Sequence, residues 1–177
     1  MRRSWLAVLV LASLTACAGP APQGSAATYV SKELGFAFKL PEGWKMYGEE
    51  AKSKGGTLIN WQVKSLEGAE PGWLEGLPES VVPELGRWTS HFFGDIQEEQ
   101  KETGTVGGEP ALIVTHTVHE PKLTTRKQVR YWVVRHGQVL YLIRAVYPAE
   151  REPEEDPGAR ALLATWRFTP PTGTLPS

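Results

Sequence analysis

The sequence predicts an α+β fold: a central, largely antiparallel sheet of about seven strands with helices packed on it. Two observations predict this class. Segments rich in β-branched and aromatic residues follow one another with short polar breaks, and only two segments have the apolar period of a helix. Because most strands are consecutive, an antiparallel sheet is favoured over alternating βαβ units.

The strongest strand signal covers residues 128–147, where two apolar runs flank His136 and Gly137. We predict a hairpin whose two-residue loop is His136-Gly137, so that Arg135 pairs with Gln138. The facing pairs in this register are Val133–Leu140, Tyr131–Leu142, Val134–Val139 and Trp132–Tyr141. Both faces are apolar near the turn, so we expect the hairpin to lie in the middle of a sheet that is covered on both sides.

Residues 1–16 have the features of a bacterial secretory signal peptide. Arg2 and Arg3 give a basic start, and residues 5–12 form an apolar core that is too short to span a bilayer. Residues 14–17, Leu-Thr-Ala-Cys, resemble the lipobox of bacterial lipoproteins. This resemblance implies cleavage before Cys17 and a diacylglyceryl group on its thiol. The alternative is an ordinary secretory signal with an incidental cysteine.

Cys17 is the only cysteine of the chain. The mature chain therefore has no disulfide, and acylation leaves no thiol for catalysis. Two or three acyl chains, such as palmitate, hold a protein on a membrane far more firmly than one chain does. Ala18 stands where enteric bacteria often place Asp to keep lipoproteins at the inner membrane. By that analogy the periplasmic face of the outer membrane is favoured in a Gram-negative organism.

The remaining chain divides into three parts. Residues 17–27 predict a lipidated cysteine and a flexible tether, whose reach is at most about 35 Å. Residues 28–169 predict a single domain, and the Pro/Gly/Thr-rich residues 170–177 predict a flexible tail. The whole chain has 19 basic and 20 acidic residues, and Arg2 and Arg3 leave with the signal. A mildly acidic chain does not collect on nucleic acid by electrostatics alone.

Short strands precede the first helix. We expect strands at residues 28–32 and 36–40, and a Pro41-Glu42-Gly43 turn that joins the latter to a strand at 44–47 as a hairpin. A polar loop at 49–56 leads to a strand at 57–66. Four Gly or Pro positions then predict that residues 67–78 form a loop.

Two segments have helical periodicity. In residues 78–93 an apolar face is predicted, capped by Ser80 and ended by Gly94. In residues 159–167 a second face is predicted, preceded by an acidic loop at 150–156. The residues on the two faces are Val81, Leu85, Trp88 and Phe92, and Ala159, Leu162, Leu163 and Trp166. Between the helices we expect a charged edge strand at 96–106 and a strand at 110–119.

The order of these elements and a few residues resemble a known family. The matching features are Tyr29, then Gly35-Phe36-x-Phe38-x-x-Pro41-x-Gly43-Trp44, then Gly108-x-Pro110-Ala111, the Tyr141 strand and a terminal amphipathic helix. Residues 28–168 are similar to the PsbP-like superfamily, in particular to bacterial DcrB-type lipoproteins. The superfamily also includes the photosystem II extrinsic protein and a Ran-binding nuclear transport factor.

This resemblance implies an α/β/α sandwich with helices on both faces of the sheet. It implies no shared activity, because members dock on partners rather than catalyse a common reaction. No site of the family maps residue by residue onto this chain.

The histidines do not predict a metal site. His116 and His119 are three residues apart, a spacing that brings ligands together on a helix but sends them to opposite faces of a strand. His91 lies beside the apolar face of the first helix, and His136 lies in the predicted turn.

No catalytic motif is present either. The serines lack the Gly-x-Ser-x-Gly setting of a nucleophile. Residues 104–108, Gly-Thr-Val-Gly-Gly, resemble a phosphate loop, but no Lys-Ser/Thr follows, and we predict a hairpin turn. We therefore expect no enzyme, no metal and no cofactor.

Three groups of residues leave alternatives open. The acidic run could bind calcium weakly or form a solvated lead-in to the helix. The basic residues around the central hairpin could form an anion-binding or docking edge, or pair with the acidic loop. Three tryptophans could line a ligand groove or pack in the core. The groups are Glu150, Glu152, Glu154, Glu155 and Asp156; Arg126, Lys127, Arg130, Arg135 and Arg144; and Trp61, Trp73 and Trp88.

Three functional hypotheses follow. The first is a non-enzymatic, lipid-anchored module of the cell envelope that binds another protein or helps to assemble a complex. The second is a carrier or sensor of a small apolar ligand, such as a lipid or a peptidoglycan fragment. An unrecognised hydrolase comes last. A carrier needs a concave, partly apolar cavity, whereas a docking module needs an exposed apolar patch. 

Overall fold

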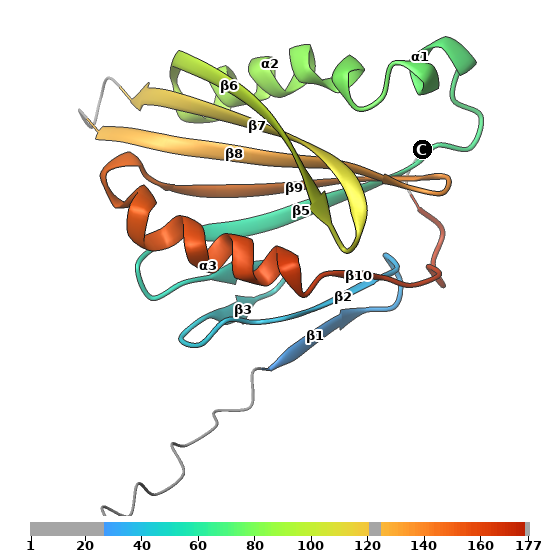
Figure 1. Ribbon diagram of the computed structural model, residues 1–177, viewed down its shortest axis with the longest axis horizontal. Coiled ribbons are helices and arrows are strands. Elements are labelled where there is room, and N and C mark those ends of the chain that lie inside the picture. The colour runs from blue at the N-terminus through green and yellow to red at the C-terminus, as the bar shows by residue number, and fades with distance from the viewer. Residues whose placement is uncertain (1–26, 121–124, 176–177) are drawn as a thin grey trace, which may run out of the picture.

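The computed structural model describes residues 27–120 and 125–175, in which ten strands form two antiparallel sheets (Figure 1). The strands are β1 (Thr28–Ser31), β2 (Phe36–Lys39), β3 (Lys45–Tyr47), β4 (Glu50–Lys52), β5 (Leu58–Ser65), β6 (Asp95–Val106), β7 (Glu109–Glu120), β8 (Thr125–His136), β9 (Val139–Pro148) and β10 (Arg167–Phe168). The helices are α1 (Pro71–Glu75), α2 (Val82–Phe93) and α3 (Glu152–Ala164), with short 3-10 turns η1 (Glu79–Val81) and η2 (Ala149–Arg151).

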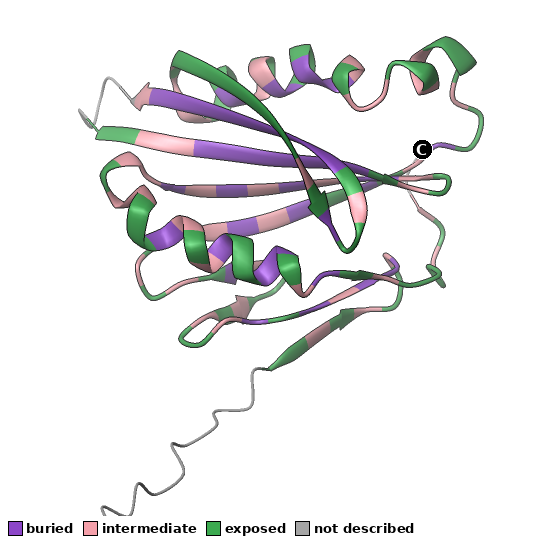
Figure 2. Cartoon of the chain, viewed as in Figure 1, coloured by how far each residue is buried: buried purple, intermediate pink, exposed green. Residues whose placement is uncertain are grey.

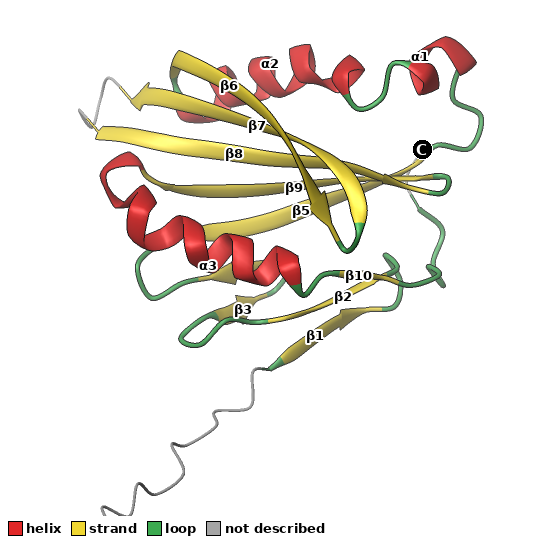
Figure 3. Ribbon diagram, in the orientation of Figure 1, coloured by secondary structure: helices red, strands yellow, loops and turns green. Residues whose placement is uncertain are grey.

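The larger sheet has seven strands in the order β3-β4-β5-β9-β8-β7-β6, and the smaller sheet has the order β1-β2-β10. Helices α1 and α2 cover one face of the larger sheet, and α3 lies with the smaller sheet against the other face (Figures 1 and 3). The predicted fold class is confirmed. The predicted signal peptide, Cys17 and residues 17–26 of the tether lie outside the described residues.

The β8–β9 hairpin lies in the middle of the larger sheet, as predicted. Trp132 and Val134 of β8 belong to the core beneath α3, whereas Tyr131 and Val133 belong to the core beneath α2. All four side chains are buried (Figure 2). The strand is therefore covered on both faces.

The predicted register of this hairpin is wrong. The two-residue loop is Gly137-Gln138, and Arg135 pairs with Leu140. Gly137 has a φ of 59°, the positive value that the first loop position of a tight hairpin turn requires, so glycine comes first and not second. Each residue is shifted by two positions relative to its predicted partner. A shift of two leaves every side chain on its predicted face, which is why the burial prediction holds.

Three predictions for the N-terminal half are wrong. Strands β2 and β3 do not form a hairpin, because β1 and β10 occupy both edges of β2 and β3 pairs with β4. Strand β4 lies within the predicted polar loop, where Ala51 is fully buried. Helix α1 lies within the second predicted loop, with Pro71 in its first turn, a position that tolerates proline.

The predicted helices exist with different ends. Ser80 does not cap α2; its hydroxyl donates to the Trp73 carbonyl, 3.5 Å away. Phe92 is 67% exposed, and Thr89 takes a buried position on the helix instead. Gly94 follows the last residue of α2, as predicted. Helix α3 begins at Glu152, so most of the acidic segment is helical and is not a loop.

The smaller sheet is attached to the larger one by stacked aromatic rings. The Phe36 ring stacks on the Trp166 ring with centroids 4.5 Å apart, and its contact with Trp61 is edge-on at 5.2 Å. Both tryptophans are almost fully buried. Trp61 is therefore a core residue, and Trp166 anchors the end of α3.

Part of the C-terminal tail runs along the start of the domain. The backbone N–H groups of Thr172 and Gly173 donate to the carbonyls of Lys32 and Glu33. Leu175 packs against the core beneath α3. From the sequence we expected a tail with nothing to bury. These contacts were missed because the backbone makes the hydrogen bonds, and the pattern of side chains does not predict backbone hydrogen bonds.

Replacing Trp132 with Ala tests the burial of the hairpin. The side chain is 2% exposed, so we expect a loss of about 3–5 kcal/mol in the free energy of unfolding, measured with urea. Phe92→Ala is the matched control, because its ring is mostly in water; we expect a change of less than about 0.5 kcal/mol. Similar losses in the two variants would contradict this account of the core.

Candidate functional site

A groove lies between helices α1 and α2 and strands β5 and β9. Its cavity has a volume of about 140 Å³. The lining residues are Gln62, Lys64, Trp73, Val81, Glu84, Leu85, Trp88, Leu140 and Leu142. Trp73 and Trp88 are half-buried, and both also contact the core beneath α2. The groove therefore has an apolar floor and two aromatic walls.

The chain fold explains why these side chains meet. On β5, Trp61 and Val63 point toward α3, so the intervening Gln62 and Lys64 face the groove. Helix α1 brings Trp73 over the same face. The cis peptide bond before Pro78 lies between α1 and η1. A second hollow of about 410 Å³ adjoins the first, and its lining residues are Lys64, Ser65, Glu67, Gly68, Ala69, Glu70 and Trp73.

The rim of the groove carries two exposed charges, Lys64 and Glu84. Neither side chain makes an ion pair within residues 27–120 and 125–175, although seven ion pairs of other Lys or Arg residues are formed there. An apolar floor with one free cation and one free anion at its edge suits an apolar side chain that is flanked by charged groups.

Its size limits what the groove can hold. Pockets for small molecules usually measure about 300–1,000 Å³, so a cavity of about 140 Å³ is too small for a lipid chain. It has room for one or two apolar side chains. Among the described residues no three His, Cys, Asp or Glu side chains are grouped so as to hold a metal ion.

Beneath α2 lies a chain of polar groups that the sequence did not predict, buried except for Glu99 at its end, which is exposed. Thr89 Oγ1 is 2.8 Å from His116 Nδ1 and 2.9 Å from the Tyr131 hydroxyl, and His116 Nε2 is 3.0 Å from Glu99 Oε2. His116 and Thr89 are fully buried. Burial lowers the pKa of His116 below its ordinary value of 6.5, although the hydrogen bond to Glu99 opposes this shift. His116 is thus a neutral imidazole that links three elements.

The order hydroxyl, imidazole, carboxylate is also that of a catalytic triad. Thr89 has no exposed surface, however, and its oxygen is already engaged by Tyr131. A substrate cannot reach this hydroxyl, so the chain ties α2 to the sheet. One signal could have revealed it: Thr89 is a polar residue four positions after the buried Leu85, on the same helical face.

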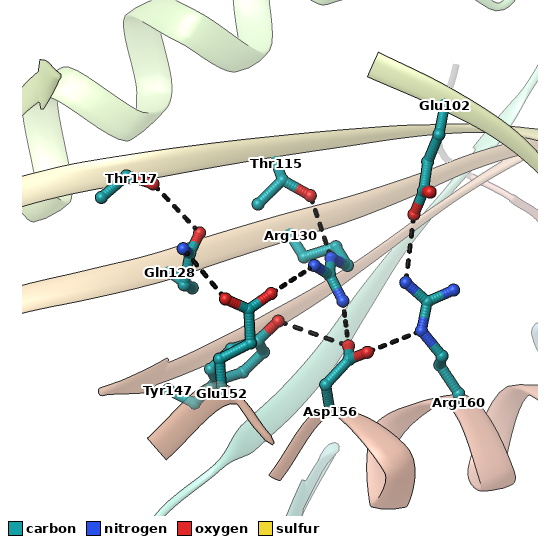
Figure 4. Close-up of polar contacts among 9 residues, drawn as sticks. All are labelled: Glu102, Thr115, Thr117, Gln128, Arg130, Tyr147, Glu152, Asp156 and Arg160. Carbon is teal, nitrogen blue, oxygen red and sulfur yellow. Dashed lines mark hydrogen bonds and ion pairs between the residues drawn. The ribbon is translucent and has the colours of Figure 1, made fainter. Parts of the chain in front are cut away.

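The opposite face of the sheet holds a network around Arg130, shown in Figure 4. The Arg130 guanidinium donates to Thr115 at 2.9 Å, to Glu152 at 2.8 Å and to Asp156. The side chain of Arg130 is only 7% exposed. Arg160 also donates to Asp156, at 2.6 Å, and to Glu102 on β6, at 3.1 Å. The network fixes the first two turns of α3 to strands β6, β7 and β8.

This network resolves two of the open alternatives. Arg130 pairs with the acidic segment, as predicted, but the pairing is buried rather than at the surface. The acidic segment is not a solvated lead-in, because Asp156 and Glu152 bind Arg130. Burial raises the pKa of Tyr147, whose hydroxyl lies 3.4 Å from Asp156 Oδ1, well above its ordinary value.

Glu155, from the same acidic run, is buried and has a separate set of partners. The hydroxyls of Ser53 and Thr57 each donate to Glu155 Oε2 at 2.6 Å, and Arg151 lies 3.2 Å away. A Cβ at Gly55 would displace this carboxylate from its position, so a larger residue there would disturb its hydrogen bonds. Burial raises the pKa of Glu155, but the hydrogen bonds from Ser53 and Thr57 and the charge of Arg151 lower it by more. The pKa therefore lies below its ordinary value of 4.5.

The other predicted candidates are dispersed. His119 lies on the opposite face of β7 from His116, as expected for a strand. His91 is exposed, and His136 pairs with Glu109 at 2.8 Å and stacks on the Phe168 ring. The predicted turn at residues 104–108 is a hairpin between β6 and β7, with its loop at Gly107 and Gly108.

The basic residues do not form one edge. Arg144 lies over the Phe93 ring at 5.1 Å and donates to Asn60, whereas Arg135 donates to the Gly137 carbonyl. Of the three candidate tryptophans, Trp73 and Trp88 line the groove and Trp61 packs in the core. None of the helices within residues 27–120 and 125–175 is long and apolar enough to cross a membrane.

Comparisons with known proteins find similarity in structure alone. No protein-family model matches the chain, and no curated protein matches its sequence. The solution structure of cyanobacterial PsbP (CyanoP) from Synechocystis sp. PCC 6803 matches with a TM-score of 0.59 and 11% identity, over 88% of this chain and 98% of that one. A crystal structure from Bacteroides thetaiotaomicron matches with a TM-score of 0.52 and 13% identity.

The Bacteroides thetaiotaomicron match covers 82% of this chain and 49% of the other chain. This chain therefore spans about half the length of that protein. Identities this low establish a shared architecture and nothing about activity. The fold is therefore PsbP-like, as the order of motifs in the sequence indicated.

Replacing Arg130 with Met tests the network of Figure 4. The change leaves Glu152 with the Gln128 amide as its remaining partner, while Asp156 keeps Arg160. We expect a loss of about 3 kcal/mol in the free energy of unfolding, the lower end of the range for breaking a buried pair. Arg160→Met is the control, because its side chain is 47% exposed, and it should lose less than about 1 kcal/mol. Equal losses would contradict a special role for Arg130.

Proposed function

We propose that the protein is a non-enzymatic module of the cell envelope, anchored by a lipid on Cys17, that binds a partner protein through the groove. The groove carries this proposal. Its apolar floor, aromatic walls and unpaired rim charges suit a partner segment that inserts one large apolar side chain and places charged groups near Lys64 and Glu84.

The anchor rests on the Leu-Thr-Ala-Cys motif at residues 14–17, on the basic start and on the short apolar core before it. The PsbP-like fold is consistent with a DcrB-type lipoprotein, the more specific resemblance of the sequence. Under this proposal the anchor holds the chain on the periplasmic face of the outer membrane, with the inner membrane as the alternative site.

The position of the groove supports a partner away from the membrane. β1, which begins at Thr28 directly after the tether, belongs to the sheet on the opposite side of the molecule from α2 (Figure 1). A tether that enters through β1 leaves the groove on the far side. We therefore propose that the partner is an envelope protein and that neither the bilayer nor nucleic acid occupies the groove.

The cavity volume supports the carrier hypothesis less well than the docking hypothesis. The groove cavity of about 140 Å³ is below the size of pockets that enclose small molecules. The adjoining hollow of about 410 Å³ is large enough, but apart from Trp73 it is lined by charged, polar and small residues, which do not suit an apolar ligand. A hydrolase is weaker still, because the hydroxyl–imidazole–carboxylate chain is buried beneath α2.

Replacing Cys17 with Ser tests the anchor. We expect incorporation of radiolabelled palmitate into the protein to be lost, because serine has no thiol to carry the diacylglyceryl group. The protein should also leave the membrane fraction. Labelling that persists in the variant would contradict the anchor.

Site-specific photo-crosslinking in intact cells tests the groove. A benzoylphenylalanine at Glu84, on the rim, should give a light-dependent adduct that disappears when Trp88 is also replaced by Ala. The matched control is the same probe at Glu42, which is exposed in the turn after β2. Adducts of equal yield at the two positions, or one that survives Trp88→Ala, would contradict binding through the groove.

A further inference from the structure

The buried polar chain lies directly beneath the helix that walls the groove. Leu85 and Trp88 of α2 line the groove, and Thr89 of the same helix points to His116 in the sheet. Whatever loosens the contact of Thr89 with His116 therefore also moves one wall of the groove.

The hydrogen bonds of this chain have one consistent direction. His116 is neutral, and Glu99 can only accept, so Nε2 carries the proton and donates to the Glu99 carboxylate. Nδ1 is then an acceptor, to which the Thr89 hydroxyl donates. Thr89 Oγ1 in turn accepts from the Tyr131 hydroxyl. Each donor among His116, Thr89 and Tyr131 then has an acceptor.

A second proton on His116 breaks this order. Nδ1 becomes a donor, so the protons of Nδ1, Thr89 and Tyr131 all meet at two contacts, Thr89–His116 and Thr89–Tyr131. One of the two hydroxyl protons is then left without an acceptor in this chain, at a site where both residues are buried. A buried donor without a partner destabilises the arrangement that holds it, and a buried charge is added to it.

We propose that His116 is an acid-sensitive latch for the groove: its protonation releases α2 from the sheet and dismantles the groove wall. This inference rests on the proposed function for the role of the groove. Binding through the groove would then weaken in acid.

The charges around His116 set the pH range. On β6, Glu99 lies opposite His116 in the ladder and Lys101 binds Glu99 at 3.0 Å. On β8 the titratable neighbour is Tyr131, and α2 presents the uncharged Thr89. The other histidine of this region, His91 of α2, is exposed near the C-terminal end of the helix.

The sign of the pH dependence follows from the lowered pKa. The open form binds a proton near pH 6.5, while the closed form binds it only at lower pH. Stability of the α2 contact is therefore fully present above pH 6.5 and is lost progressively as the pH falls through the pKa of the folded protein. The pKa of Glu99 lies below 4.5, because its hydrogen bonds from Lys101 and His116 outweigh its burial, so Glu99 stays charged throughout this range.

Amide hydrogen exchange of the purified full chain, read by mass spectrometry and corrected for intrinsic rates, tests the latch. Between pH 6.5 and 5 we expect the opening of α2 to increase by up to about tenfold per pH unit, since one proton is taken up. Peptides of α3, held by Arg130 on the other face, are the internal control and should not change. A flat profile for α2, or an equal rise in α3, would overturn the proposal.

Two variants assign the proton. His116→Gln should abolish the acid-induced opening of α2, whatever its stability at neutral pH. Glu99→Gln removes the charge that favours the imidazolium, so the opening should remain at least as steep as in the parent chain. If His116→Gln does not fold, Glu99→Gln decides: loss of the pH dependence there would assign the proton to the carboxylate and overturn the latch. Because the measurement needs no partner, failure of the groove as a docking site would show only in the crosslinking.

Discussion

The burial of both faces of the β8–β9 hairpin is the constraint on which the rest of the structure depends. A sheet whose central strands carry apolar residues on both sides is stable only if each side is covered. Here α1 and α2 cover one side, and α3 and the smaller sheet cover the other. The ends of the sheet need no such cover: β6, at one edge, carries exposed charges along most of its length.

Each cover is attached by buried polar groups as well as by apolar contact. Arg130 binds the start of α3, and His116 binds the middle of α2 through Thr89. The two attachments differ in their response to pH. Arg130 donates to the carboxylates of Glu152 and Asp156, whereas His116 holds α2 only while its imidazole is neutral. The groove lies on the face of the sheet that α2 covers, where the attachment depends on the neutral form of His116.

Much of the fold could be predicted from local pattern. Alternation in β5, β7, β8 and β9 gave the correct faces, and the order of motifs indicated the PsbP-like architecture. Short elements were missed, because three residues in β4 or five in α1 give too few periods to recognise. Trp73 and Trp88 were candidates for a groove, but half-exposed tryptophans become a groove only when α1 is folded over β5 and β9.

The sequence by itself determined the longer strands, their faces and the Leu-Thr-Ala-Cys motif at residues 14–17, because each of these depends on residues that are close together in the chain. The tertiary structure alone decided which residues meet across the sheet. Glu99, His116 and Thr89 come from three elements, and Arg130 joins a helix that begins more than twenty positions later. No local pattern records such contacts, since what brings them together is the closure of the two layers over the central hairpin.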